Sequence, residues 1–226
     1  MLHSNQQTVE IVNIMRLKTC LVPAGFIVFF ITGLINNSSA LPTTKLLADL
    51  LAQGLLQIKR GEPELALVTA RKAIELDANI PESYFLLGRA QQDIGLKSDS
   101  LSSYTTAISL NPHYSFAYSN RGLVKASTGE YVEAIKDFNQ AIKIDGKFAA
   151  AYLNRGVARG ATGDARAALK DFSIAINLNP KYTEAYQNRG IARELVGDMS
   201  GACSDWKIAA TNGSKDALLW YNNQCL

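Results

Sequence analysis

Residues 149–182 read AAAYLNRGVARGATGDARAALKDFSIAINLNPKY, and a segment of this length and pattern occurs five times between residues 47 and 216. Glycine recurs at this constant step in two rows, and alanine recurs in a third. The rows are Gly54, Gly88, Gly122, Gly156 and Gly190; Gly61, Gly95, Gly129, Gly163 and Gly197; and Ala73, Ala107, Ala141, Ala175 and Ala209. A fixed period of this size predicts a solenoid, in which each copy is one structural unit.

Two aromatic rows keep the same period, and the first repeat departs from both of them. The rows are Tyr84, Tyr118, Tyr152 and Tyr186, with Leu50 in the first repeat, and Tyr104, Phe138, Phe172 and Trp206, with Ala70 in the first repeat. We expect the glycines and small residues to let neighbouring helices approach closely, and the aromatic rings to fill the remaining space. One hairpin cannot bury all of its apolar surface, so each must stack on the next.

Each repeat predicts two helices. In 115–148, small and apolar residues lie three and four positions apart, the pair Thr128-Gly129 interrupts them, and a second stretch of the same spacing follows. A glycine at the interruption suits the left-handed turn that ends a helix. The pairs Asp145-Gly146 and Asn179-Pro180 are expected to end the second helix and to cap the next one. The fold class is therefore all-α, built from αα-hairpins.

The unit resembles the tetratricopeptide repeat (TPR), whose signature Tyr-x-x-Arg-Gly, Ala, Phe or Trp, Ala, Pro is met almost in full. Repeats three to five share a subtype reading Ala-Tyr-x-Asn-Arg-Gly, as at 151–156. The resemblance implies a right-handed superhelix of five repeats. These are 47–80, 81–114, 115–148, 149–182 and 183–216, after a linker at 41–46 and before a capping helix at 217–226.

The resemblance also implies that the first helices line a concave groove that holds a peptide segment. The matching positions are Phe85, Phe116, Ser119, Asn120, Leu123, Leu153, Asn154, Val157, Gln187, Asn188 and Ile191. Within them Asn120, Asn154 and Asn188 form a row, and a side-chain amide both donates and accepts, so it suits a peptide backbone of any sequence. The alternative is that these asparagines only tie neighbouring helices together.

Composition and motifs argue against catalysis and against nucleic acid. The net charge is +3 with 19% charged residues of interspersed sign, and no run of Lys or Arg matches a line of phosphates. Of the two histidines, His3 lies near the N-terminus and His113 lies in a turn. No metal-binding or nucleophile motif is present, so we expect no enzyme activity, no metal and no cofactor.

Charged residues also follow the repeat period. Asp137, Asp171 and Asp205 lie one repeat apart from each other, as do Arg121, Arg155 and Arg189. Repetition at the structural period indicates a scaffold, because a catalytic site needs asymmetric roles. We predict that these arginines pair with these aspartates, between helices or between adjacent repeats, and stabilise the C-terminal repeats.

The N-terminal segment 1–40 differs from the repeats. An uncharged run at 20–35 follows Arg16 and Lys18, and a small-x-small site ends at Ala40, so cleavage before Leu41 is expected. These are the three parts of a secretory signal peptide, and the run is short for a spanning helix. An uncleaved membrane anchor is the alternative. Either way the positive-inside rule places the repeats in a periplasmic, lumenal or extracellular compartment.

Two cysteines lie near the C-terminus. The tail 215–225 predicts one more helix, and a turn at 212–214 would bring Cys203 opposite Cys225. Export favours a disulfide between them, worth about 3 kcal/mol in the chain-entropy model. Two buried free thiols are the alternative.

These observations favour a non-catalytic scaffold of an exported compartment that binds a peptide segment of another protein in its groove. The alternative is a self-associating structural module, or an assembly factor for a membrane-associated complex. The membrane is involved only through the N-terminal segment, if it is not cleaved.

Overall fold

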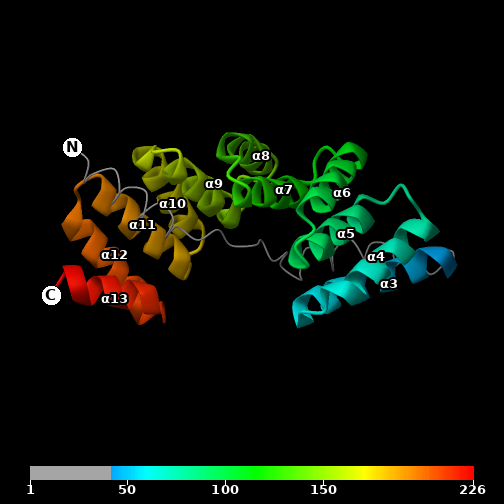
Figure 1. The fold of residues 1–226 in the computed structure, drawn as a ribbon, viewed down its shortest axis with the longest axis horizontal. Coiled ribbons are helices and arrows are strands. Elements are labelled where there is room, and N and C mark those ends of the chain that lie inside the picture. Colours follow the sequence, from blue (N-terminus) through cyan, green and yellow to red (C-terminus); the bar gives the residue numbers. More distant parts are fainter. Residues whose placement is uncertain (1–41) are drawn as a thin grey trace. The chain divides into compact units, whose positions relative to one another are not determined.

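The computed structural model describes residues 42–226, and all of its secondary structure is helical in that range. Eleven helices follow one another along the described chain (Figure 1). They fall into an N-terminal unit that ends at Val124 and a C-terminal unit that begins at Lys125, with the division inside one helix. Each unit is described by itself below. No strand occurs in the described range, as the sequence predicts.

The helices come in consecutive pairs of similar length. In the N-terminal unit these are α3 (Pro42–Arg60) with α4 (Pro63–Leu76), and α5 (Pro81–Asp93) with α6 (Lys97–Leu110). The pair α7 (Ser115–Ser127) and α8 (Tyr131–Ile144) spans the division, and α9 (Ala149–Ala161) with α10 (Ala165–Leu178) and α11 (Thr183–Leu195) with α12 (Met199–Thr211) follow. A last helix, α13 (Lys215–Gln224), has no second member in the described chain. The two-helix unit read from the sequence is confirmed.

The turn inside each hairpin is left-handed at its row glycine. At the end of α9, Gly163 has φ +88°, a conformation that a side chain would strain, and Asp164 N–H donates to the Arg159 carbonyl at 2.9 Å. The Asp164 carboxylate then accepts from Ala167 N–H at 2.9 Å and caps α10. The predicted role of the mid-repeat glycine is therefore confirmed.

The residue pairs Asp145-Gly146 and Asn179-Pro180 at the repeat ends behave differently from the prediction. Asn179 ends α10, and its side-chain oxygen accepts from the Lys181 N–H at 3.2 Å, while Asp145 does the same for Lys147 at 2.9 Å. These are Asx turns, in which the side chain bonds the backbone two residues on. The next helices, α9 and α11, begin without a side-chain cap, so the predicted capping of the following helix is wrong.

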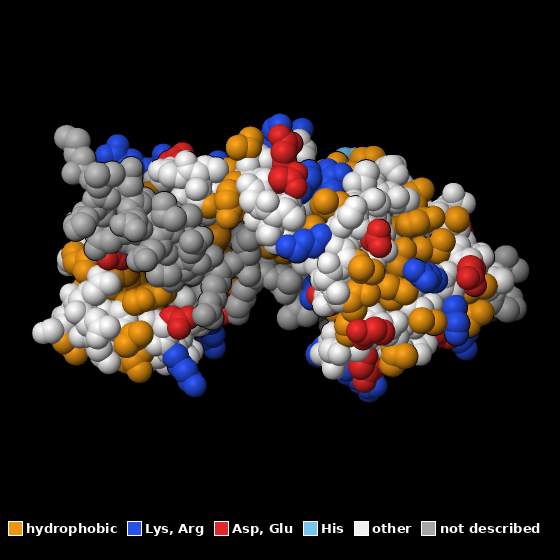
Figure 2. Space-filling model, in the orientation of Figure 1, with side chains coloured by type: hydrophobic (Ala, Val, Ile, Leu, Met, Phe, Trp, Pro, Cys, Tyr) orange, Lys and Arg blue, Asp and Glu red, His pale blue; other side chains and the backbone are white. Residues whose placement is uncertain are grey.

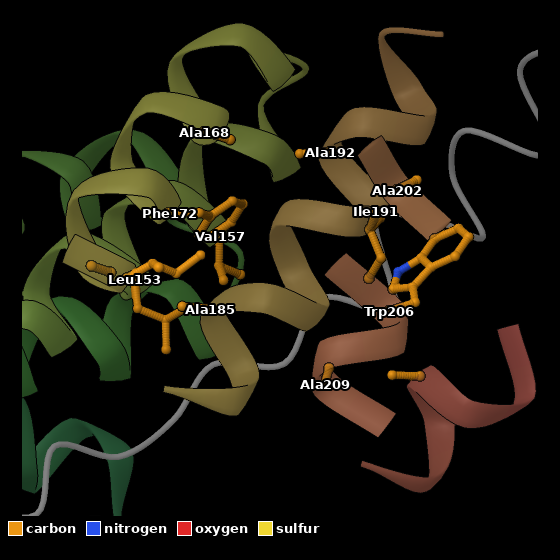
Figure 3. Close-up of a cluster of buried hydrophobic side chains, with 13 residues drawn as sticks. Leu153, Val157, Ala168, Phe172, Ala185, Ile191, Ala192, Ala202, Trp206 and Ala209 are labelled. Atoms are coloured by element: carbon orange, nitrogen blue, oxygen red, sulfur yellow. The ribbon is translucent and has the colours of Figure 1, made fainter. Parts of the chain in front are cut away.

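The core of the C-terminal unit is built from one large ring per hairpin. Phe172 and Trp206 are fully buried, and Figure 3 shows Phe172 beside Val157, with Ile191 and Trp206 further along the same cluster. A Cβ atom added at Gly156 would lie 2.6 Å from the Phe172 ring, and one at Gly190 would overlap the Trp206 indole. The first-helix glycines therefore make room for the aromatic ring of the second helix, more than for its small residues.

The N-terminal hairpin fills the same space in another way. Its second helix carries Ala70 where later repeats carry an aromatic ring, and a Cβ atom at Gly54 would overlap Leu86 of α5. Leu86 packs with Leu47, Leu51 and Ala70 in one buried cluster. A leucine from the next hairpin thus replaces the missing ring.

Two predicted boundaries shift in the structure. α3 begins at Pro42, inside the segment 41–46 that was predicted as a linker. α13 begins at Lys215, as the helix predicted over 215–225 does, and two residues before the domain boundary predicted at 217. Ser214 caps α13 through a bond from the Ala217 N–H at 3.2 Å. The predicted signal segment 1–40 and the predicted cleavage pair Ala40 and Leu41 lie outside the described residues. Within 42–226 no helix is both long and apolar enough to cross a bilayer.

A disulfide fixes the capping helix. Cys203 in α12 is bonded to Cys225 just after α13, and their Cα atoms are 5.7 Å apart. The bond joins the last hairpin to the helix that follows it, and the Trp206 and Trp220 rings lie 5.8 Å apart beside it. The predicted pairing is confirmed.

Candidate protein-interaction face

The eleven residues predicted to line a groove all lie on the first helices of repeats two to five. Phe85 is on α5, Phe116, Ser119, Asn120 and Leu123 are on α7, Leu153, Asn154 and Val157 are on α9, and Gln187, Asn188 and Ile191 are on α11. In the full-length chain every one of these side chains is buried, and the most exposed, Phe116, reaches 9%. The asparagine row is therefore buried in this structure, and the residues lie on the first helices as predicted. Whether they bind a peptide stays a prediction.

The asparagine side chains are partly engaged within the protein. Asn120 Nδ2 donates to the Phe116 carbonyl one turn earlier, at 2.9 Å. The Oδ1 atoms of Asn120 and Asn188 are buried and accept no hydrogen bond from the residues that the structure describes. Buried polar atoms are almost always satisfied in native proteins, so each such oxygen calls for an explanation. The Oδ1 atoms of Asn120 and Asn188 can therefore still accept a hydrogen bond.

The apolar row and the glutamine have partners of their own. Leu153, Val157 and Ile191 belong to the buried cluster of the C-terminal unit. Gln187 Oε1 accepts from the Ser214 hydroxyl at 2.9 Å, so this side chain helps to hold the start of α13. These contacts give the predicted groove residues a structural role in addition to any role in binding.

The predicted arginine–aspartate pairs form in repeats four and five. Arg155 of α9 donates two hydrogen bonds to Asp171 of α10, at 2.7 and 3.0 Å, and Arg159 donates a third at 2.8 Å. Arg155 also donates to Asn139 of α8 at 2.7 Å and lies 5.3 Å from the Tyr152 ring centre. One guanidinium thus connects three helices from two successive hairpins.

Repeat five repeats this arrangement. Arg189 donates to both oxygens of Asp205 at 2.8 Å and to the Ser173 hydroxyl at 3.3 Å, and Arg193 adds a pair to Asp205 at 2.9 Å. The hydrogen bond to Asp205 raises the pKa of Arg189 above its ordinary value, so the guanidinium stays charged. Sequence reasoning missed Arg159 and Arg193, although their spacing of four from the first arginine marks them as neighbours on one helix face.

In the earlier repeats other groups also contact these positions. In repeat three, Lys125 pairs with Asp137 at 2.8 Å, and Arg121 donates to the Thr105 hydroxyl of the preceding hairpin at 3.1 Å. In repeat two Ser103 replaces the aspartate and donates to Gln91 at 2.6 Å.

Three further side chains have a raised pKa. Burial raises the pKa of Glu82 and of Glu194, and burial followed by the nearby Glu82 charge raises the pKa of Tyr114. Across residues 42–226 no group of three or more histidine, cysteine or acidic side chains is placed to hold a metal ion.

Comparison with known families decides what the hairpins are. Residues 81–114 match a family model described as "Tetratricopeptide repeat", and residues 125–163 match one described as "TPR repeat". The chain contains tetratricopeptide repeats. The predicted fold class, an all-α solenoid of TPR hairpins with a capping helix, is confirmed by these matches together with the helices of 42–226.

Solved structures of the same fold are similar to this TPR chain. MamA is 27% identical over 73% of this chain and 96% of its own, with a TM-score of 0.63. The pilF protein of Pseudomonas aeruginosa is 18% identical, covers 78% of this chain and 82% of its own, and has a TM-score of 0.74. YrrB, described as a TPR protein with an unusual peptide-binding site, is 16% identical over 88% of this chain and 99% of its own, with a TM-score of 0.61.

A comparison with curated proteins finds no match. The TPR fold indicates a protein–protein interaction scaffold, and TPR proteins are generally not enzymes. At 16–18% identity the likeness to pilF and YrrB speaks for the fold alone.

Proposed function

We propose that this TPR protein is a non-catalytic scaffold that binds a peptide segment of another protein against its first helices. The observation that carries the proposal is the buried Oδ1 acceptor on the first helix, found at Asn188 in the C-terminal unit and again at Asn120 in the N-terminal unit. Leaving such an atom without a donor costs about 1–3 kcal/mol. Its recurrence at one repeat position indicates a role beyond packing.

The chemistry of these positions restricts the ligand. An acceptor whose own amide hydrogens are used internally, as at Asn120, binds a donor, and the backbone N–H of an extended peptide is the donor that every sequence supplies. The apolar neighbours Val157 and Ile191 suit aliphatic side chains of the same segment. A clamp for a terminal carboxylate is not expected, because the matching positions Ser119, Asn154 and Glu184 lack basic groups.

Export is a second part of the proposal. The basic residues, the uncharged run at 20–35 and the site at Ala40 support a signal segment that places the repeats outside the cytoplasm. The disulfide between Cys203 and Cys225 fits an oxidising compartment. A mass measurement on the protein from its host separates the alternatives, because cleavage leaves a chain that starts at Leu41, whereas an uncleaved anchor retains the segment.

The experiment for binding is a crosslinking pull-down from the host with the full-length chain as bait. We expect the double variant Asn120→Ala with Asn188→Ala to capture its partners at least tenfold less well than the wild type, because the two Oδ1 acceptors are lost. The double variant Gln140→Ala with Asn223→Ala, at exposed positions on α8 and α13, serves as the matched control and should capture them equally. Melting curves of both variants report whether the fold is retained. A folded Asn120→Ala, Asn188→Ala variant that keeps every partner would contradict the proposal.

A further inference from the structure

One face of α3 is uncovered, although the equivalent face of every later first helix is buried. Asp49 and Leu56 of α3 are exposed, Leu56 by 46%. At steps of one repeat Asp49 corresponds to Ser83, Ala117, Ala151 and Ala185, and Leu56 to Ala90, Val124, Ala158 and Ala192, all at most 2% exposed. Within the described chain no helix precedes α3, so this face lacks the cover that the corresponding helices have.

The uncovered face carries a regular seam. Leu46, Asp49, Gln53 and Leu56 are spaced by three, four and three residues, which places them in one stripe along the helix. Leu46 is 49% exposed, and Asp49 and Gln53 are exposed as well. Figure 2 shows hydrophobic side chains gathered on the surface of the N-terminal unit, with charged groups between them. An exposed apolar stripe with polar residues inside it is typical of a helix that meets another helix.

The seam is complementary to itself. When two copies of α3 are laid antiparallel, Leu46 of one meets Leu56 of the other, and Asp49 meets Gln53, each pair occurring twice. Gln53 can donate an amide hydrogen to the carboxylate of Asp49. Ala52 lies near the twofold axis, where a small side chain allows the backbones to approach. An isologous contact requires this reciprocity, in which residue i meets residue j and j meets i.

We propose that this α3 face is a homodimer contact, formed by two copies of the chain with their α3 helices antiparallel. The pair of Asp49 and Gln53 indicates that a second copy of the chain covers the α3 face. The chain's own uncharged run at 20–35 has no amide or basic side chain to pair with Asp49, and its hydroxyl donor is that of Thr32, whereas a second copy brings the Gln53 amide to each Asp49. The other end of the repeats is covered by α13 and held by the Cys203–Cys225 disulfide. This inference does not depend on peptide binding by the first helices.

Two lysines beside the seam lower the affinity of the proposed dimer. Lys45 and Lys59 are exposed on the side where Ala52 lies, and in the antiparallel pair Lys45 of one copy comes near Lys59 of the other. Like charges in such flanking positions oppose association. The dimer is therefore weak in the wild type, and Lys59→Glu should tighten it by creating two opposite-charge pairs.

The test is sedimentation of the full-length chain in a mild detergent over a range of concentrations. The wild type should show a monomer–dimer equilibrium. Gln53→Asp, which places two carboxylates opposite each other twice, should raise the dissociation constant at least tenfold. Adding Asp49→Gln to Gln53→Asp exchanges the positions of the carboxylate and the amide. This double variant should have the dissociation constant of the wild type. Lys59→Glu should lower the dissociation constant at least fivefold, and Gln140→Asp on α8 is the control that should change nothing.

Each outcome bears on the proposal. A wild-type chain that stays monomeric, as it would if its own N-terminal segment covered α3, overturns it. A Gln53→Asp variant that associates like the wild type overturns it as well. Failure of the exchange in Asp49→Gln with Gln53→Asp would exclude the antiparallel register, because any other packing does not pair these two positions with each other.

Discussion

Arg155→Met is expected to destabilise the C-terminal unit by about 3 kcal/mol, since removing one partner of a buried ion pair leaves the buried carboxylate only partly compensated. Asp171, which Arg155 contacts, is only 1% exposed and keeps a single cation, Arg159. The variant also loses the bond to Asn139 of the preceding hairpin. Methionine retains most of the apolar stem, so the effect measures the guanidinium. Urea unfolding followed by circular dichroism gives the change in the free energy of unfolding.

The control for this variant is Arg166→Met on α10, where the side chain is exposed. A surface change of this kind alters stability by about 0.5 kcal/mol or less. If Arg155→Met unfolds at the same urea concentration as the wild type, the row of charged contacts is dispensable. The account of the C-terminal unit would then rest on its apolar core alone.

Loss of the disulfide should have an effect of similar size, confined to the last hairpin and its cap. The bond joins residues 22 apart, and a loop of that length corresponds to about 3 kcal/mol in the chain-entropy model. In Cys203→Ser with Cys225→Ser we expect the amides of α13 to exchange with solvent much faster, because only Ala217 of this helix is buried. Hydrogen exchange read by mass spectrometry resolves the change helix by helix.

Gln140→Ser, at an exposed position on α8, is the control for the cysteine variants, because it introduces a serine far from the disulfide in the sequence. Its exchange in α13 should equal that of the wild type. Equal protection of α13 with and without the Cys203–Cys225 bond would show that Ser214, Gln187 and the tryptophan rings hold the cap by themselves.

The fold was predictable because its signals are local and repeated. Glycine at Gly163 and its equivalents marks a left-handed turn whatever surrounds it, and the spacing of apolar residues gives the helices on either side. The Arg155–Asp171 pair was predictable for a related reason, since two residues that recur at one period occupy fixed positions in successive hairpins. The Cys203–Cys225 pairing followed from the length of the two segments around one turn.

The burial of the candidate face was not predictable in the same way. Helical periodicity shows that Asn154 and Asn188 lie on one side of their helices, but it does not show what covers that side. The Asx turns at Asp145 and Asn179 were missed because the same residue types serve as caps and as turns, and only the backbone decides between them. The boundary at Pro42 was missed because the first repeat lacks the aromatic rows that define the others.

Photo-crosslinking from the first-helix face tests the central claim most directly. A photoreactive residue at Ala150, half-buried on α9, is compared with one at Lys170, exposed on α10, in the full-length chain. The account predicts that a partner peptide crosslinks to position 150 and not to position 170. Crosslinks at position 170 with none at position 150 would place the partner on the second helices and contradict the account.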